Sequence, residues 1–93
     1  MRTIDELRSD IDEIDNDLLV LLKKRKKLVT LVARYKSNHH MTIIDSKRER
    51  QLLSQLSKKA KQNGLDPKFV AKLYDIILKN SRTEQKNINK DGV

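Results

Sequence analysis

The stretch IDELRSDIDEIDNDLLVLLKKRKKLVTLVARYK, residues 4–36, decides the fold of this 93-residue chain. Its apolar residues recur at alternating steps of three and four, namely at Ile4, Leu7, Ile11, Ile14, Leu18, Leu21, Leu28, Val32 and Tyr35. This spacing predicts one long helix with an apolar stripe along a single face. One position departs from the pattern, because the step after Leu21 falls on Arg25. A guanidinium in an apolar seam is costly unless an anion meets it.

The predicted helix is too long for the chain to cover by itself. It starts near Thr3, which can cap it with Glu6 three residues on, and runs to about Ser37. A helix over residues 3–37 is about 50 Å long, whereas a compact chain of this size is only about 30 Å across. The apolar stripe therefore needs a partner, most simply a second copy of the chain.

Two shorter helices are expected after a loop over residues 38–44. The first covers about residues 46–62, with its apolar face on Leu52, Leu53, Leu56 and Ala60, and Asn63-Gly64 stops it. Asp66-Pro67 opens the other, which covers about 67–88 with the apolar line Val70, Leu73 and Ile77. Residues 89–93 are expected to fray. The fold class is therefore all-α, with three helices in one domain spanning 1–93.

Composition narrows the classes of partner. The net charge is +8, from 21 Lys and Arg against 13 Asp and Glu, which favours an anionic partner, either nucleic acid or a small polyanion. Only three aromatic residues are present, too few for base stacking along a single strand. No apolar run is long enough to span a membrane and no secretory signal is evident, so a cytoplasmic location is the default expectation. Cysteine is absent, which excludes disulfides and Cys-based metal sites.

Arg25 has two open interpretations. Its side chain either extends to solvent beside its apolar neighbours, or it anchors a carboxylate or phosphate through its planar fork. Lys36 lies about three turns further along nearly the same face, so the two long side chains could reach the same small dianion. Arg8 lies about 25 Å from Arg25 along the helix and on another face. If Arg8 is not simply paired with Asp12, it reaches a site built by another subunit.

Further candidates lie on the two shorter helices. Ser46 and Glu49 fit a capping box, yet Arg48 and Glu49 also sit one turn before an apolar face and could point inward. Ser81 and Gln85 continue the apolar row of the last helix, where they either satisfy each other or face a ligand. The adjacent pair His39-His40 lacks partners at ligand spacing, so no metal site is expected. This residue set suits anion binding and polarisation better than covalent chemistry.

Together these segments resemble the all-helical chorismate mutases of the AroQ class, most closely the mutase domain of bacterial chorismate mutase–prephenate dehydratase proteins. The resemblance covers about Ile4 to Ile88. It depends on LRSDIDEIDNDLLVLLKKR at 7–25, Lys36, DSKRER at 45–50, GLDP at 64–67 and SRTEQ at 81–85. It implies an intertwined helical homodimer with two active sites, and the rearrangement of chorismate to prephenate without a cofactor or metal.

The resemblance also implies a role for each site residue. Arg25 grips a substrate carboxylate, and Arg8 is lent to the site of the other subunit. Lys36 binds a carboxylate and donates to the ether oxygen, to which Gln85 donates from the opposite side. Glu49 accepts from the substrate hydroxyl near the backbone of Asp45. Arg48 and Ser81 occupy the remaining positions, and Lys47 stands where the family has an aspartate, at an apparently peripheral place.

Other functions fit the residues less well. Isochorismate–pyruvate lyases share the fold and much of the pattern, but tend to lack the pair that stands here as Arg48-Glu49. A basic helical nucleic-acid binder is disfavoured by Arg25 in the seam and by the scarcity of aromatics. A mutase-like domain without turnover is expected to lose Lys36 or Gln85, and both are present. The residues leave open residual lyase activity, and whether the chain is a free-standing enzyme or a piece of a bifunctional one.

Overall fold

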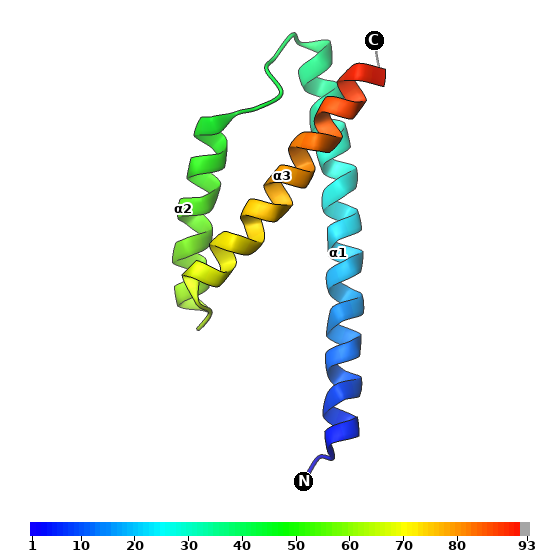
Figure 1. Cartoon of the computed structure of the whole chain (residues 1–93), viewed down its shortest axis with the longest axis vertical. Coiled ribbons are helices and arrows are strands. Elements are labelled where there is room, and N and C mark those ends of the chain that lie inside the picture. Colours follow the sequence, from blue (N-terminus) through cyan, green and yellow to red (C-terminus); the bar gives the residue numbers. More distant parts are fainter. Residues whose placement is uncertain (92–93) are drawn as a thin grey trace.

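Three helices make up the chain, as the sequence predicts (Figure 1). They are α1 (Ile4–Asn38), α2 (Ser46–Gln62) and α3 (Pro67–Asp91). The computed structural model describes the backbone of residues 1–91 and the side chains of residues 1–88. No strand occurs within residues 1–91, and α3 packs against both α1 and α2. The all-α prediction is confirmed.

Helix α1 begins where the sequence suggests. Thr3 is its N-cap, with the hydroxyl accepting a hydrogen bond from the backbone N–H of Glu6 at 3.2 Å. The carboxylates of Asp5 and Glu6 lie in the first turn and Lys36 in the last, in line with the helix dipole. The N-terminal half of α1 projects past the other two helices and has no neighbour in the chain (Figure 1).

The start of α2 corrects one expectation. Asp45 rather than Ser46 is the N-cap, and its side chain accepts from the backbone N–H of Arg48 at 3.0 Å. Ser46 is thus the first residue inside the helix, and the capping box proposed for Ser46 and Glu49 is wrong. With Asp45 as the N-cap, Glu49 is the fourth helical residue and not the third, from which a capping-box carboxylate reaches back to the N-cap N–H, and it makes its contacts elsewhere.

The turn from α2 to α3 is a Schellman motif. Leu65 N–H donates to the Ala60 carbonyl at 2.8 Å and Gly64 N–H to the Lys61 carbonyl at 3.2 Å. Gly64 has φ of +70°, a left-handed conformation that favours glycine. The Asp66 carboxylate then accepts from Lys68 N–H at 3.0 Å, so Asp66 caps α3 as expected, with Pro67 at the first position.

Helix α3 is longer than expected. The segment 89–93, expected to fray, is helical as far as Asp91, and residues 92–93 lie outside the described part. On the predicted apolar line Val70 is buried and Ile77 half-buried, whereas Leu73 is 42% exposed within one chain and lines a groove against α2. Leu78 and Ser81, which lie outside that line of three, are also buried.

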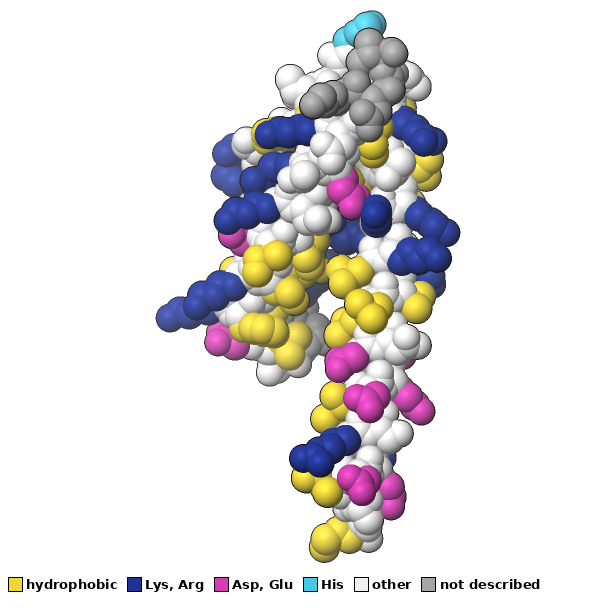
Figure 2. All heavy atoms as spheres, turned by 45° about the vertical axis from the view of Figure 1, so that its right-hand side comes forward, with side chains coloured by type: hydrophobic (Ala, Val, Ile, Leu, Met, Phe, Trp, Pro, Cys, Tyr) yellow, Lys and Arg dark blue, Asp and Glu magenta, His cyan; other side chains and the backbone are white. Residues whose placement is uncertain are grey.

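One chain buries little of its apolar surface. Among the described residues the buried apolar side chains are few and small: Ala33, Ala60, Val70 and Leu78. The accessible surface is 7904 Å², against about 5,600 Å² for a compact protein of this mass. The radius of gyration is 16.8 Å, against about 12 Å. Figure 2 shows the uncovered hydrophobic side chains along α1 and on the facing sides of α1 and α3.

None of the described helices is both long and apolar enough to cross a bilayer.

The glycine in the α2–α3 turn gives the first testable prediction. In Gly64→Ala the new methyl meets no atom within 4 Å, so only the left-handed backbone opposes it. We expect the free energy of unfolding to fall by roughly 1 kcal/mol, measured by chemical denaturation at one fixed protein concentration. Ser54→Ala, at an exposed position inside α2, is the control and should be neutral or slightly stabilising. An equal effect of both variants would contradict the strain argument.

Candidate active site

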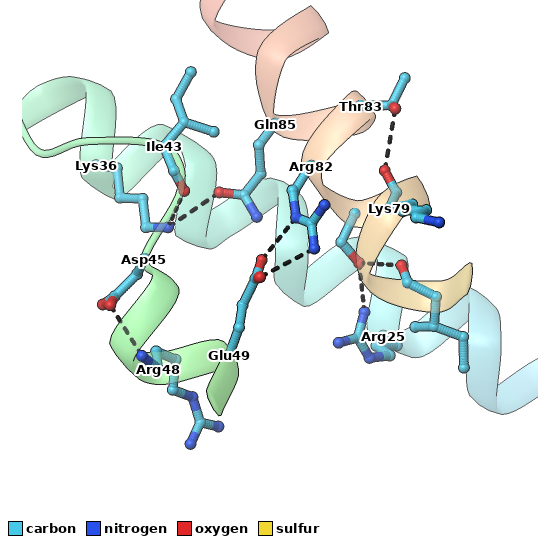
Figure 3. Close-up of polar contacts among 12 residues, drawn as sticks. Arg25, Lys36, Ile43, Asp45, Arg48, Glu49, Lys79, Arg82, Thr83 and Gln85 are labelled. Carbon is cyan, nitrogen blue, oxygen red and sulfur yellow. Dashed lines mark hydrogen bonds and ion pairs between the residues drawn. The ribbon is translucent and has the colours of Figure 1, made fainter. Parts of the chain in front are cut away.

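A cavity of about 240 Å³ opens between the C-terminal half of α1, the start of α2 and the C-terminal half of α3. All of the expected site residues except Arg8 line it. Its polar lining consists of Arg25, Lys36, Asp45, Arg48, Glu49, Ser81, Arg82 and Gln85, and its floor is apolar, with Leu28, Val29, Val32, Ile43, Leu52 and Leu78. A volume of this size suits a small ligand. Figure 3 shows these polar side chains and their contacts.

Arg25 turns inward from the seam of α1. Its Nη1 donates a hydrogen bond to the Ser81 hydroxyl at 2.6 Å, and Ser81 in turn donates to the Ile77 carbonyl at 2.9 Å. Ser81 is only 8% exposed. A neutral hydroxyl thus orients the guanidinium without cancelling its charge, so the side chain does not extend to solvent as the alternative interpretation held. Ser81 and Gln85 do not satisfy each other: Ser81 bonds Arg25, Gln85 bonds Lys36, and both side chains line the cavity.

Lys36 joins three parts of the site. Its ammonium donates to the Ile43 carbonyl in the α1–α2 loop at 2.6 Å and to Gln85 Oε1 on α3 at 3.1 Å. An ammonium has three donors, so one remains for a ligand. The Gln85 amide accepts through its oxygen and therefore keeps its NH₂ group as a donor (Figure 3). The amide orientation is assigned from this contact.

The first turn of α2 supplies Arg48 and Glu49, which point in different directions. Arg48 is exposed, and its guanidinium is directed away from Lys36 and Gln85 (Figure 3). Glu49 is half-buried and forms a two-pronged ion pair with Arg82 of α3, at 2.9 Å from Nε to Oε1 and 3.0 Å from Nη2 to Oε2. Of these two side chains, Glu49 is therefore the one that faces inward.

Arg82 was missed in the sequence. Its hydrogen bonds to Glu49 raise its pKa above the ordinary value; burial opposes this effect, and the Glu49 charge adds to it. The guanidinium is accordingly charged at any pH of interest. A signal was available, because Arg82 continues the i+4 row of Tyr74 and Leu78, the second of which is buried. The apolar line predicted for this helix, Val70, Leu73 and Ile77, does not include that row.

Arg8 lies apart from this cavity. It is exposed on the projecting half of α1, 17 residues before Arg25 and about 25 Å away along the axis. No ion pair joins it to Asp12 among the described residues. Within one chain the structure does not bring Arg8 to the other candidates.

The cavity carries more positive than negative charge. Four basic side chains line it with two carboxylates. Glu49 is taken by Arg82, and Asp45 caps α2. Within the described residues Arg25, Lys36 and Arg48 have no carboxylate partner, and no group of three His, Asp or Glu is placed to hold a metal ion. The arrangement suits a ligand with two negative charges and an acceptor oxygen between Lys36 and Gln85.

The model of the family "Chorismate mutase type II" matches residues 7–86, a range that includes every lining residue of the cavity. This chain belongs to that family.

Named relatives in the family differ in length and substrate. A bifunctional chorismate mutase/prephenate dehydratase of Buchnera aphidicola is 38% identical over 89% of this chain, which spans only 22% of that protein. A chorismate mutase of Methanocaldococcus jannaschii is 32% identical, with 87% of this chain and 82% of the relative aligned. A 4-amino-4-deoxychorismate mutase of Streptomyces venezuelae is also 32% identical, with 81% and 73% aligned.

The contact of Lys36 with Ile43 predicts that this side chain holds the α1–α2 loop as well as lining the cavity. We expect Lys36→Met to speed amide hydrogen exchange of residues 39–45 by about tenfold, because one part-buried hydrogen bond to the loop is lost. Mass spectrometry of the corresponding peptide measures the rate. Lys86→Met, at an exposed position of α3, is the control. Unchanged exchange in Lys36→Met would show that the loop keeps its position without the lysine.

Proposed function

We propose that this chain catalyses the rearrangement of chorismate to prephenate in aromatic amino acid biosynthesis. One observation supports this above the others: Arg25, Lys36 and Arg48 line one small cavity together with Gln85, and within the described residues none of the three cations has a carboxylate partner. Chorismate carries two carboxylates, an ether oxygen and a hydroxyl. The cavity provides cations for the carboxylates, N–H donors for the ether oxygen, and Glu49 as an acceptor for the hydroxyl.

The reaction asks for little covalent chemistry from the protein. Within one molecule the carbon–oxygen bond of the ether breaks while a carbon–carbon bond forms between the enolpyruvyl arm and the ring. Arg25 grips one carboxylate and, with Lys36, holds the arm over the ring, which removes rotational freedom before the reaction. Negative charge develops on the ether oxygen as the bond breaks. Donors already aimed at that oxygen stabilise the transition state more than the ground state.

Lys36 and Gln85 supply those donors. Their mutual contact at 3.1 Å leaves one N–H of the ammonium and the NH₂ of the amide as free donors. The two side chains come from different helices, α1 and α3, and in this proposal their free donors point at the same ether oxygen. Glu49 accepts from the substrate hydroxyl beside the backbone of Asp45, Arg48 lies near the hydroxyl, and Ser81 lies near the ring carboxylate while it keeps Arg25 in place.

The active form in this proposal is a homodimer with intertwined α1 helices. The surface in excess of a compact protein, about 2,300 Å² per chain, is in the range of obligate interfaces. A second cavity of about 490 Å³ between α1 and α3 has an apolar wall of Leu22, Val29, Ile76 and Ile77, suited to a helix of the partner. Arg8 on the projecting half of α1 would then complete the site of the other subunit.

The alternatives remain weaker. Arg48-Glu49 at the start of α2 favours the mutase over an isochorismate–pyruvate lyase, and Arg25 faces a cavity and not an exposed nucleic-acid surface. A cytoplasmic location stays a prediction from the sequence.

Removing Arg25 tests the site. We expect Arg25→Ala to lower kcat/KM for chorismate by about a hundredfold to a thousandfold, because a charge aimed at a substrate carboxylate is lost. The assay follows loss of chorismate absorbance, with prephenate identified as product. Lys24→Ala, the neighbour on the exposed face of α1, should keep wild-type turnover. Near-normal activity of a folded Arg25→Ala would refute the assigned role.

Mixing two inactive variants tests the shared site. Arg8→Ala and Arg25→Ala chains are unfolded together and refolded, so that about half of the dimers are mixed and each mixed dimer has one intact site. We expect recovery of about a quarter of the wild-type activity. Each variant refolded alone is the control. Activity no higher than the controls, with mixed dimers present by mass spectrometry, would contradict a site built from two chains.

A further inference from the structure

The ion pair of Arg82 and Glu49 is built into the wall of the cavity. Arg82 donates through Nε and Nη2, one to each carboxylate oxygen, at 2.9 and 3.0 Å, and the side chains are 30% and 22% exposed. The other ion pairs made by α3 do not line this cavity: Lys79 with Asp75 lies on the exposed face, and Lys26 with Glu84 lies beside the neighbouring cavity. Arg82 therefore lies at the site itself, where the proposed mechanism assigns it no role.

Pairing leaves Glu49 able to bind a ligand. Each carboxylate oxygen has two acceptor positions, and Arg82 uses one on each oxygen. The fork also fixes the plane of the carboxylate, so the remaining positions are oriented before a ligand arrives. Glu49 is then an acceptor whose negative charge is already compensated.

A compensated carboxylate treats neutral and charged donors differently. A neutral hydroxyl that donates to Glu49 gains the hydrogen bond and meets no repulsion. A protonated amine in the same place lies within about 6 Å of the guanidinium, given two successive hydrogen-bond distances, and like charges at that distance repel each other in a partly dehydrated site. Without Arg82, the uncompensated carboxylate would favour the amine.

We propose that Arg82 is a specificity-determining residue, which makes this cavity select a substrate with a neutral hydroxyl over the same molecule with a protonated amine in its place. The inference rests on the proposed function, in which Glu49 accepts from the substrate hydroxyl. Both kinds of substrate occur in the family, since one relative is named a 4-amino-4-deoxychorismate mutase. Arg82 touches Glu49 and acts on the substrate through charge and through the position of that carboxylate.

The test measures kcat/KM for chorismate and for 4-amino-4-deoxychorismate in the same preparations. Wild type should prefer chorismate. Arg82→Gln should shift the ratio about tenfold toward the amine. Glu49→Gln, which removes the opposite charge, should shift it the other way. Arg82→Lys keeps the charge but loses the fork, so both rates should fall while the ratio stays within about threefold of wild type.

Lys79→Gln is the matched control, because it removes the same charge from α3 one turn away and outside the cavity. It should leave both rates unchanged. A merely structural tie between α2 and α3 would lower both rates together and leave the ratio unchanged in Arg82→Gln and in Glu49→Gln. That result would overturn the inference; if Arg82→Gln fails to fold, Arg82→Met, which also removes the charge and keeps a long side chain, is measured in its place.

The outcomes also separate the two proposals. A folded wild type that turns over neither substrate overturns the proposed function, and the inference with it. An active wild type whose ratio does not respond to the two charge-removing variants overturns the role of Arg82 alone.

Discussion

The apolar stripe of α1 is longer than the rest of the chain can cover, and this constraint governs the molecule. Helix α3 packs only against the C-terminal half of α1, and among the described residues one chain buries few apolar side chains. The hydrophobic effect that would stabilise a helix of this length is therefore largely unused within one protomer. The same projecting half of α1 carries Arg8 away from the cavity of its own chain. A dimer would account for both features, because a second chain would cover the apolar stripe of α1 and would provide a site that Arg8 can reach.

The covered half of α1 carries two of the cations that line the cavity. Arg25 and Lys36 both lie there, and each is held by neutral partners: Arg25 by a hydroxyl, Lys36 by a carbonyl and an amide oxygen. Neutral acceptors orient a cation without neutralising its charge. Arg82 is the exception, since a carboxylate holds it. Because the charge of Arg82 is compensated by Glu49, its function differs from that of Arg25 and Lys36, whose charges are available to a ligand.

The sequence predicts the helices well and the polar contacts only in part. The spacing of the apolar residues and the N-cap Thr3 were sufficient to predict α1, because both are local signals in the sequence. The start of α2 was ambiguous, since Asp45 and Ser46 are both good caps, and only the backbone at Asp45 decides between them. The helical row through Leu73 was predictable, but that Leu78 is more buried than Leu73 depends on how the helices pack, which periodicity does not give.

Within the site, residue positions were predictable and pairings were not. Lys36 reaches Ile43 through a loop whose path has no periodic signal, and Arg82 meets Glu49 across 33 residues. Periodicity says which face a residue occupies, whereas a hydrogen bond between helices depends on their crossing and separation. The resemblance assigns roles to residues by their position, and it assigns none to Arg82. It therefore gives no indication of the ion pair between Arg82 and Glu49.

The charge of the cavity links its stability to its function. Four cations and two carboxylates share a space of about 240 Å³, and like charges so close together oppose folding. Glu49 relieves part of that repulsion and ties α2 to α3 at the same time. Within the described residues the other three cations have no carboxylate partner, which is a usual cost of a preorganised binding site. A bound dianion would remove that repulsion, so the ligand that the site is built to hold is also the group that would complete its electrostatic balance.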